Sequence, residues 1–316
     1  MKRMKLGNTP LEVSWIALGC MRLSDNRNQA VATIRAALDQ DINFFDHADI
    51  YGRGKREQVF SEIWERVPGL RDKVILQSKC GIRFAGDPDA RAPKRYDFSY
   101  EHVIHSVEGS LRRLKTDYLD VLLLHRPDAL VEPEEVARAF DHLHQAGKVR
   151  FFGVSNHTAA QIQLLQTCVE QPLVANQLEL NVIHTQLIND GIIFNRDDRS
   201  MASRSEGTLQ FCRMHNITVQ AWSPLARGAV SGKPVVNPDA RIECTAALVA
   251  QLAEEKGVSK EAIVIAWLLR HPARIQPIIG TTNPARIAAA CQADDVELTH
   301  EEWYSLFIAG RGGELP

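Results

Sequence analysis

The chain has 316 residues, of which 45% are hydrophobic and 24% are charged, and its formal net charge is −2 at pH 7. These are the values of an ordinary globular protein, and the scattered Lys and Arg residues exclude the basic surface that nucleic acid requires. No apolar run reaches the length of a membrane span, and the N-terminus lacks the apolar core of a signal peptide, so we expect a cytoplasmic protein without nucleic-acid or membrane partners.

Residues 1–15, MKRMKLGNTPLEVSW, carry a Gly-Asn-Thr-Pro turn between two short alternating stretches. This pattern predicts a β-hairpin, which we expect to close the bottom of the fold. Eight short apolar runs follow along the chain, and each predicts a strand. The predicted strands cover residues 15–20, 42–48, 73–80, 118–125, 151–156, 173–179, 218–224 and 275–281.

Amphipathic segments with a period near 3.6 residues separate these runs and predict helices. They cover residues 28–40, 57–67, 100–114, 133–147, 158–169, 206–215, 243–257 and 259–271, so that one of the last two is additional to the repeat. Apolar strands that alternate with helices indicate a parallel sheet, and eight units in about 250 residues favour a closed (β/α)₈ TIM barrel. We therefore expect one domain over residues 1–316, an N-terminal hairpin and extra C-terminal helices.

Three long polar stretches follow the third, sixth and seventh predicted strands, at residues 83–99, 181–205 and 225–241. Barrel enzymes build their active sites from the loops after the strands. These stretches are therefore candidate walls for a substrate and a cofactor.

The six cysteines are far apart, with no C-x-x-C pair, and we expect them to be reduced. His142 and His144 are the histidines closest to a metal-binding spacing, but residues two apart on a helix face different directions. We expect no metal site.

Polar residues stand at the ends of three consecutive predicted strands. Alternation places Ile42, Phe44 and Asp46 on one face of the second strand, and a carboxylate that follows apolar residues inward needs a partner. Lys79 ends the third strand and His125 ends the fourth. Each could have an ordinary structural role, such as capping a turn, facing solvent or completing core hydrogen bonds.

Together with Tyr51, which follows the second strand, these residues suit proton donation by a phenol. Lys79, held by Asp46, is expected to lower the pKa of Tyr51 from about 10 toward neutral pH. His125 is expected to orient a carbonyl oxygen.

Further polar residues could hold a hydride donor. Ser155, Asn156 and Gln177 end the fifth and sixth strands and could bind a carboxamide, and Trp222 could stack on a nicotinamide or pack in the core. After the eighth strand, Gly280, Thr281 and Thr282 lead into a helix that Asn283 or Thr282 caps and that has Pro284 in its first turn. The start of this helix, with Arg286 one turn in, is suited to phosphate.

At this point the sequence resembles the aldo-keto reductase family over nearly its whole length, and within it the bacterial oxidoreductases of the YdhF type. The resemblance rests on an ordered set of segments: LGNTPLEVSWIALGCMRL, NFFDHADIYG, SKCG, LDVLLLHRPD, GKVRFFGVSN, ANQLELN, AWSPLARGAVSGK and IIGTTNPARI. It implies a catalytic tetrad of Asp46, Tyr51, Lys79 and His125, and a reductase that converts an aldehyde or ketone to an alcohol.

The resemblance also implies that NADPH lies across the top of the barrel, with Trp222 against its nicotinamide. The implied cofactor contacts are Cys20, Met21, Asp46, Ser155, Asn156, Gln177, Trp222, Ser223, Pro224, Leu225, Ala226, Arg227, Lys233, Gly280, Thr281, Thr282 and Arg286. Two cations, Lys233 and Arg286, favour NADPH over NADH because they suit a 2′-phosphate.

The sequence departs from the family pattern at three places. His47 replaces a common threonine, Gly280 replaces a lysine that binds the 2′-phosphate in many members, and Ala289 and Ala290 replace a Glu-Asn pair. Two other functions stay open. The chain could be an NADPH-binding regulatory subunit with little turnover, as in the related potassium-channel β subunits, or an aldolase that forms a Schiff base through Lys79.

Overall fold

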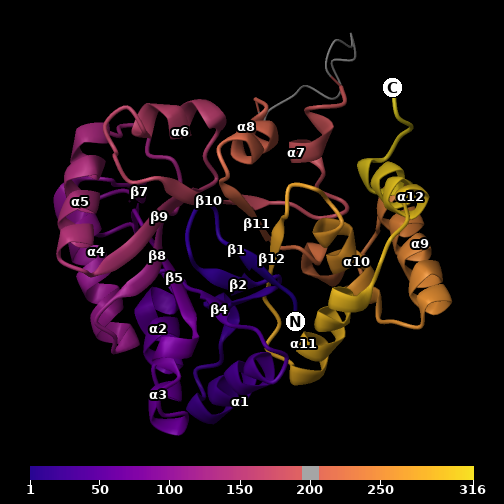
Figure 1. Ribbon diagram of the computed structural model, residues 1–316, viewed down its shortest axis with the longest axis horizontal. Helices are drawn as coiled ribbons and strands as arrows, with labels where there is room; N and C mark the ends of the chain where they lie inside the picture. The colour runs from indigo at the N-terminus through magenta and orange to yellow at the C-terminus, as the bar shows by residue number, and fades with distance from the viewer. Residues whose placement is uncertain (194–205) are drawn as a thin grey trace.

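The computed structural model describes residues 1–193 and 206–316. Eight parallel strands close into a barrel in the order β10-β11-β12-β3-β4-β5-β8-β9, with helices around the outside (Figure 1). The predicted TIM barrel is thus confirmed, with one strand from each of the eight apolar runs. The strands are β3 (Ala17–Gly19), β4 (Phe44–Asp46), β5 (Ile75–Cys80), β8 (Leu119–Leu124), β9 (Val149–Ser155), β10 (Leu173–Glu179), β11 (Thr218–Trp222) and β12 (Gln276–Ile279).

The helices pack their apolar faces on the outer side of the barrel and form the larger of two core clusters. Those between the strands are α1 (Arg27–Leu38), α2 (Lys55–Phe60), α3 (Ile63–Arg66), α4 (Tyr100–Leu114), α5 (Pro133–Gln145), α6 (Ala159–Leu165), α7 (Gln186–Asn189), α8 (Thr208–Met214), α9 (Ala240–Lys256) and α10 (Lys260–Leu269). After the last strand come α11 (Pro284–Cys291) and α12 (His300–Arg311). No helix in the described ranges is both long and apolar enough to cross a membrane.

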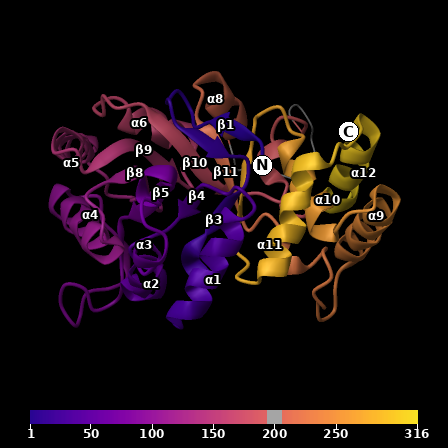
Figure 2. The same cartoon turned by 60° about the horizontal axis from the view of Figure 1, so that its bottom comes forward.

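The predicted N-terminal hairpin is also confirmed. Strands β1 (Arg3–Lys5) and β2 (Glu12–Ser14) pair antiparallel, and Figure 2 shows them against one end of the barrel. Met4 and Val13 of the hairpin share a second core cluster with Phe44 and Ile75 from inside the barrel. Gly7 permits this close fit, because its φ is +52° and a Cβ there would lie 2.8 Å from the carbonyl oxygen of Val174.

Some elements differ from the prediction. The helix expected over residues 57–67 is divided into α2 and α3, and the loop after β5 contains a short antiparallel pair, β6 (Ile82–Arg83) and β7 (Arg95–Tyr96). The extra helix between β11 and β12 is α9, which packs on α12 at the margin of the fold (Figure 1). Extra C-terminal helices were expected, but no bounds were predicted for α12. It is fixed to α10 by stacked Trp267 and Trp303, each of which donates its indole N–H to the other's carbonyl oxygen.

Candidate active site

Strand β4 carries a carboxylate into the barrel. Phe44 belongs to the interior core cluster and Phe45 to the outer one, so alternation places Asp46 inside, as predicted. Ile42 was wrongly placed on this inner face: it lies before the strand begins and packs in the outer core. Asp46 stands opposite Gln77 in the neighbouring strand β5, two residues before Lys79.

The loop after β4 returns Tyr51 toward β5. It continues the pairing of the two strands, because the backbone N–H groups of His47 and Asp49 donate to the carbonyl oxygens of Gln77 and Lys79 at 2.8 and 3.0 Å. A 3₁₀ turn at Tyr51–Gly54 follows, with three consecutive residues at positive φ. Such backbone favours glycine, which occupies two of the three positions.

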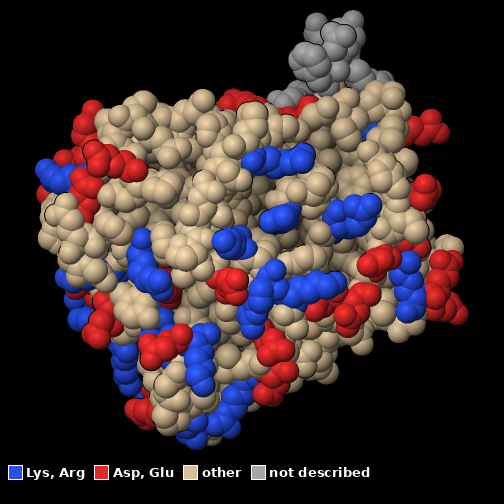
Figure 3. Space-filling model, viewed as in Figure 1, with Lys and Arg blue, Asp and Glu red and all other residues tan. Residues whose placement is uncertain are grey.

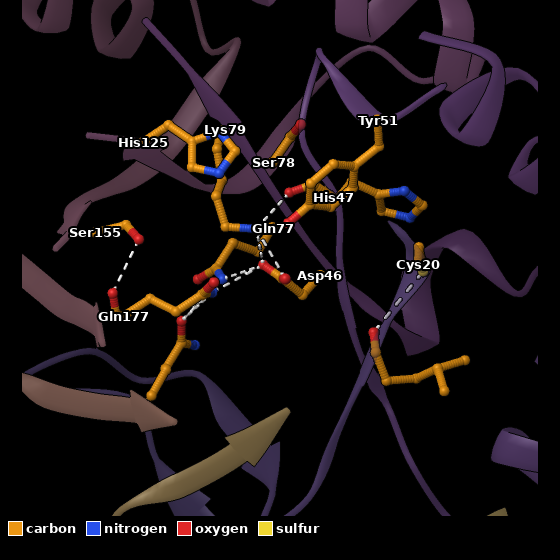
Figure 4. Close-up of polar contacts among 12 residues, drawn as sticks. Cys20, Asp46, His47, Tyr51, Gln77, Ser78, Lys79, His125, Ser155 and Gln177 are labelled. Carbon is orange, nitrogen blue, oxygen red and sulfur yellow. Dashed lines mark hydrogen bonds and ion pairs between the residues drawn. The ribbon is translucent and has the colours of Figure 1, made fainter. Parts of the chain in front are cut away.

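Lys79 is the centre of the cluster at the end of these strands (Figure 4). Its side chain is fully buried, and its Nζ donates to Oδ2 of Asp46 at 2.8 Å, to the carbonyl oxygen of His47 at 2.8 Å and to the Tyr51 hydroxyl oxygen at 3.1 Å. Burial is the largest single influence and opposes the charged form of this ammonium, but the charges and hydrogen bonds of Asp46 and Tyr51 together outweigh it, and the pKa of Lys79 is raised. All three N–H donors are therefore used.

The expected decrease in the pKa of Tyr51 was wrong in direction. Burial raises this pKa above 10, and although Lys79 lowers it, Asp46 raises it again. The phenol is therefore protonated at neutral pH. This is the form that a proton donor must have, with Lys79 placed to stabilise the phenolate that donation leaves.

His125 follows β8, whose Val121 and Leu123 face the barrel interior. The centroid of its ring lies 6.0 Å from the centroid of the Tyr51 ring, and the two ring planes make an angle of 80°. Burial, and then the charges of Lys79 and Arg126, hold the pKa of His125 well below its usual value. The imidazole is neutral and has one N–H to donate.

His47 lies beside the cluster but outside its hydrogen bonds. Its ring packs edge-on against Phe60 with centroids 4.5 Å apart, and neither ring nitrogen has a hydrogen-bond partner in the described residues. Burial, followed by the charge of Lys79, lowers the pKa of His47 to about 3. Its backbone takes part in the polar network, since its carbonyl accepts from Lys79 and its N–H donates to Gln77, but its ring does not.

The expected nicotinamide contacts converge at the same end of the barrel. Asn156 donates to the carbonyl oxygen of His125 at 3.2 Å and accepts the indole N–H of Trp222 at 3.1 Å. Asn156 also donates to the hydroxyl oxygen of Ser155, and that hydroxyl donates to the backbone oxygen of Gln177. The side chains of Ser155, Asn156 and Trp222 therefore form one hydrogen-bonded group, which Gln177 joins through its backbone oxygen.

The remaining predicted residues lie on loops around this group. Cys20 is buried after β3 and Met21 beside it is half exposed. The loop after β11 consists of Ser223, Pro224, Leu225, Ala226 and Arg227. Three of these residues, Ser223, Ala226 and Arg227, have positive φ. Gly280, Thr281 and Thr282 follow β12, and of the two expected caps, Asn283 and Thr282, it is Asn283 that caps α11, accepting the N–H groups of Ala285 and Arg286.

Lys233 and Arg286 line one pocket together with Ser231, Gly232 and Glu261. The last three were not predicted. Glu261 forms an ion pair with Arg286, whose Nε lies 3.3 Å from Oε1. On the face seen in Figure 3, basic side chains occur around the centre among acidic ones. The loop at 181–205, also expected to form a wall, includes residues 194–205, which lie outside the described residues.

Arg126 and three interior glutamines were not predicted as site residues. The guanidinium of Arg126 lies 5.7 Å from the centre of the Trp222 ring. Gln77 and Gln220 stand in the middle of apolar strands, and Gln276 begins β12. A polar residue at an inward position of a barrel strand was the available signal for the glutamines.

A TIM barrel with paired Lys79 and Asp46 beside Tyr51 at the ends of its strands has the features of a barrel enzyme. The model of the Aldo/keto reductase family matches residues 15–307, and the chain belongs to this family of oxidoreductases, which act on small carbonyl substrates. In the parts of the chain that the structure describes, no group of His, Cys, Asp and Glu residues could hold a metal ion.

Two relatives are similar over almost their entire length. The chain is 37% identical to Oxidoreductase YdhF of Escherichia coli, covering 96% of both chains, and 35% identical to a 6-dehydroglucose reductase of Agrobacterium fabrum, covering 100% of both. Among solved structures, the glycerol dehydrogenase AKR11B4 of Gluconobacter oxydans has the same fold, with a TM-score of 0.81, 23% identity and coverage of 99% of this chain and 97% of that one.

Proposed function

We propose that the protein is a cytoplasmic, single-domain reductase that uses NADPH to convert an aldehyde or ketone to an alcohol. The observation that carries this proposal is the position of Lys79, whose ammonium donates to the Asp46 carboxylate and the Tyr51 hydroxyl at the same time. An ammonium beside a phenol stabilises the phenolate that remains when the phenol gives up its proton.

In the proposed reaction, Tyr51 donates its proton to the carbonyl oxygen of the substrate. Lys79 compensates the charge left on the phenol oxygen, and Asp46 keeps Lys79 in place. His125, which is neutral, donates an N–H to the same carbonyl oxygen and orients it. NADPH, when bound, supplies the hydride to the carbonyl carbon, so that hydride and proton together give the alcohol.

The residues around the cluster fit such a cofactor. Ser155, Asn156 and Gln177 offer amide and hydroxyl groups next to the indole of Trp222, which suits the carboxamide and the ring of a nicotinamide. The loop 223–227 can cover the pyrophosphate. A Cβ at Gly280 would meet no atom within 4 Å, so the backbone there is open to close approach by the adenosine end.

The preference for NADPH rests on Lys233 and Arg286, two cations in one pocket. Glu261 opposes it, because its carboxylate holds Arg286 and would lie near a 2′-phosphate. The name of the Agrobacterium fabrum relative makes an aldehyde derived from a sugar the first substrate to try.

The two alternative functions lead to different results. An aldolase using Lys79 needs a neutral amine, whereas the pKa of Lys79 is raised and its three donors are engaged. A regulatory subunit would bind NADPH but oxidise it hardly at all. A panel of aldehydes, followed by NADPH absorbance, separates the subunit from the enzyme.

The decisive variant is Tyr51→Phe, which removes the donated proton and keeps the ring. We expect it to abolish aldehyde reduction while the dissociation constant for NADPH stays that of the wild type. Reduction at the wild-type rate by the purified variant would disprove the role of Tyr51.

A further inference from the structure

Four buried glutamines form one polar layer inside the barrel. Gln77, Gln177, Gln220 and Gln276 come from strands β5, β10, β11 and β12, and none is more than 3% exposed. The strand register places Gln177 opposite Gln220 and Gln220 opposite Gln276, while Gln77 stands opposite Asp46. Their side chains therefore connect the strands that carry the candidate catalytic cluster to the strands on the other side of the barrel.

The backbone of the N-terminal hairpin determines which amide atoms donate and which accept in this layer. The carbonyl oxygen of Ser14 can only accept, and Gln276 donates to it through Nε2 at 2.8 Å. The Oε1 of Gln276 is then left to accept from Nε2 of Gln220, at 2.9 Å. Because an amide has its donor and acceptor at opposite sides, Gln220 in turn presents its oxygen to the next members of the chain.

This series of hydrogen bonds ends in a closed ring that includes Oδ1 of Asp46. The Oε1 of Gln220 accepts from Nε2 of Gln77 at 2.8 Å and from Nε2 of Gln177 at 3.2 Å. The same two nitrogens donate to Oδ1 of Asp46, at 2.7 and 3.0 Å (Figure 4). Each of the two NH₂ groups thus uses both of its hydrogens, and the two oxygens face only donors.

One acceptor in this arrangement is left unpaired, and reversing the amide would not pair it. The Oε1 of Gln77 is buried and has no hydrogen-bond partner in the described residues. An unpaired buried acceptor destabilises the folded protein. Rotating the Gln77 amide would not remove this destabilisation, since its oxygen would then face the oxygens of Asp46 and Gln220.

We infer that this glutamine chain is a positioning device for the reaction proposed above, and the inference rests on that proposed function. It directs two N–H donors at Asp46, so that the carboxylate is held where it binds Lys79, and Lys79 is held where it reaches Tyr51. Gln220 and Gln276 are then positioning residues, although neither touches the reacting atoms. The chain also turns the Nε2 of Gln177 to Asp46, which leaves the Oε1 of Gln177 for the amide of a bound nicotinamide.

Two substitutions at Gln276 test whether its donor and its acceptor are both needed. Gln276→Met removes both hydrogen bonds. Gln276→Glu keeps both while its carboxyl is protonated, because O–H can donate to Ser14 and the other oxygen can accept from Gln220. When this carboxyl ionises, the donor is lost. Burial raises the pKa of an inserted carboxyl, by several units at fully buried positions.

We expect Gln276→Met to lower kcat at every pH, by about tenfold to a hundredfold, the scale that misplacement of a catalytic geometry by about 1 Å produces. Gln276→Glu should have kcat close to that of the wild type at low pH and lose the same factor as its carboxyl ionises. The dissociation constant for NADPH should change little in both. The matched control is Asn176→Ala, which also removes a buried amide hydrogen bond, that of Nδ2 with the His157 carbonyl oxygen, outside this chain.

A purely structural role would lower the melting temperature of all three variants without a pH-dependent loss of kcat in Gln276→Glu, and that result would overturn the inference. A second measurement does not need turnover: the ultraviolet titration of Tyr51, obtained by difference from the corresponding Tyr51→Phe protein. Its midpoint should shift in Gln276→Met and not in Asn176→Ala. An unshifted midpoint would refute the positioning role of the glutamines, whether or not the wild type reduces an aldehyde. Failure of the wild type to reduce any aldehyde would instead refute the proposed function.

Discussion

Replacing Asp49 with asparagine is expected to stabilise the protein at alkaline pH. Asp49 lies in the loop that carries Tyr51, two residues before it, and its Oδ1 is buried without a hydrogen-bond partner in the described residues. Burial, and then the negative charge of Glu57, raise the pKa of this carboxyl from 3.8 to about 7. Glu57 is itself buried, and its carboxylate forms an ion pair with Arg113.

The direction in which stability changes with pH follows from the protonation of Asp49 in the folded and unfolded states. Between pH 3.8 and about 7 the carboxyl is ionised in the unfolded chain and protonated in the folded one, so stability falls as the pH rises through this window. A difference of about three pKa units corresponds to a full loss of about 4 kcal/mol, of which between about 2 and 3 kcal/mol falls between pH 5 and pH 8. Asparagine does not titrate and has no such loss.

The measurement is the free energy of unfolding from denaturant titrations of wild type and Asp49→Asn at several pH values from 5 to 8. The difference in stability between the variant and the wild type should grow with pH by about 2–3 kcal/mol over this range. Asp117→Asn is the matched control, because Asp117 is exposed. Parallel pH dependences for Asp49→Asn and the wild type would refute the reasoning.

Two further variants test residues near the site. His47→Thr should leave the pH profile of aldehyde reduction unchanged between about pH 5 and 9, because the pKa of about 3 keeps the ring neutral throughout; loss of a near-neutral transition would show that His47 titrates in the working enzyme. Glu261→Gln should increase the preference for NADPH over NADH by about fivefold to tenfold, since it removes a carboxylate beside the pocket cations, and titration of both cofactors measures this; an unchanged ratio would place the 2′-phosphate elsewhere.

The barrel and much of the site could be predicted from the sequence because both depend on local patterns. Apolar runs that alternate with amphipathic segments gave all eight strands, and alternation along β4 was enough to turn Asp46 inward. No bounds were predicted for α12, although the capping box of Thr299 and Glu302 at its start is a local signal. What the sequence does not show is its packing, which depends on the reciprocal contact of Trp267 and Trp303, 36 residues apart.

Other features depend on burial, which the sequence alone does not express. The pKa of Tyr51 was expected to fall because a lysine lies nearby, but the cost of burying the phenolate is larger than the effect of that charge. The interior glutamines form a chain only because the barrel closes and brings β5, β10, β11 and β12 around one space.

The most direct test of the account is a single turnover of Tyr51→Phe. The variant is loaded with NADPH, mixed with an aldehyde that the wild type reduces, and followed by the loss of NADPH absorbance. If Tyr51 is the proton donor, the variant will bind NADPH with the wild-type dissociation constant and show no turnover on the time scale of the wild type. Oxidation of NADPH by the variant at the wild-type rate would contradict the claim that Tyr51 is the proton donor.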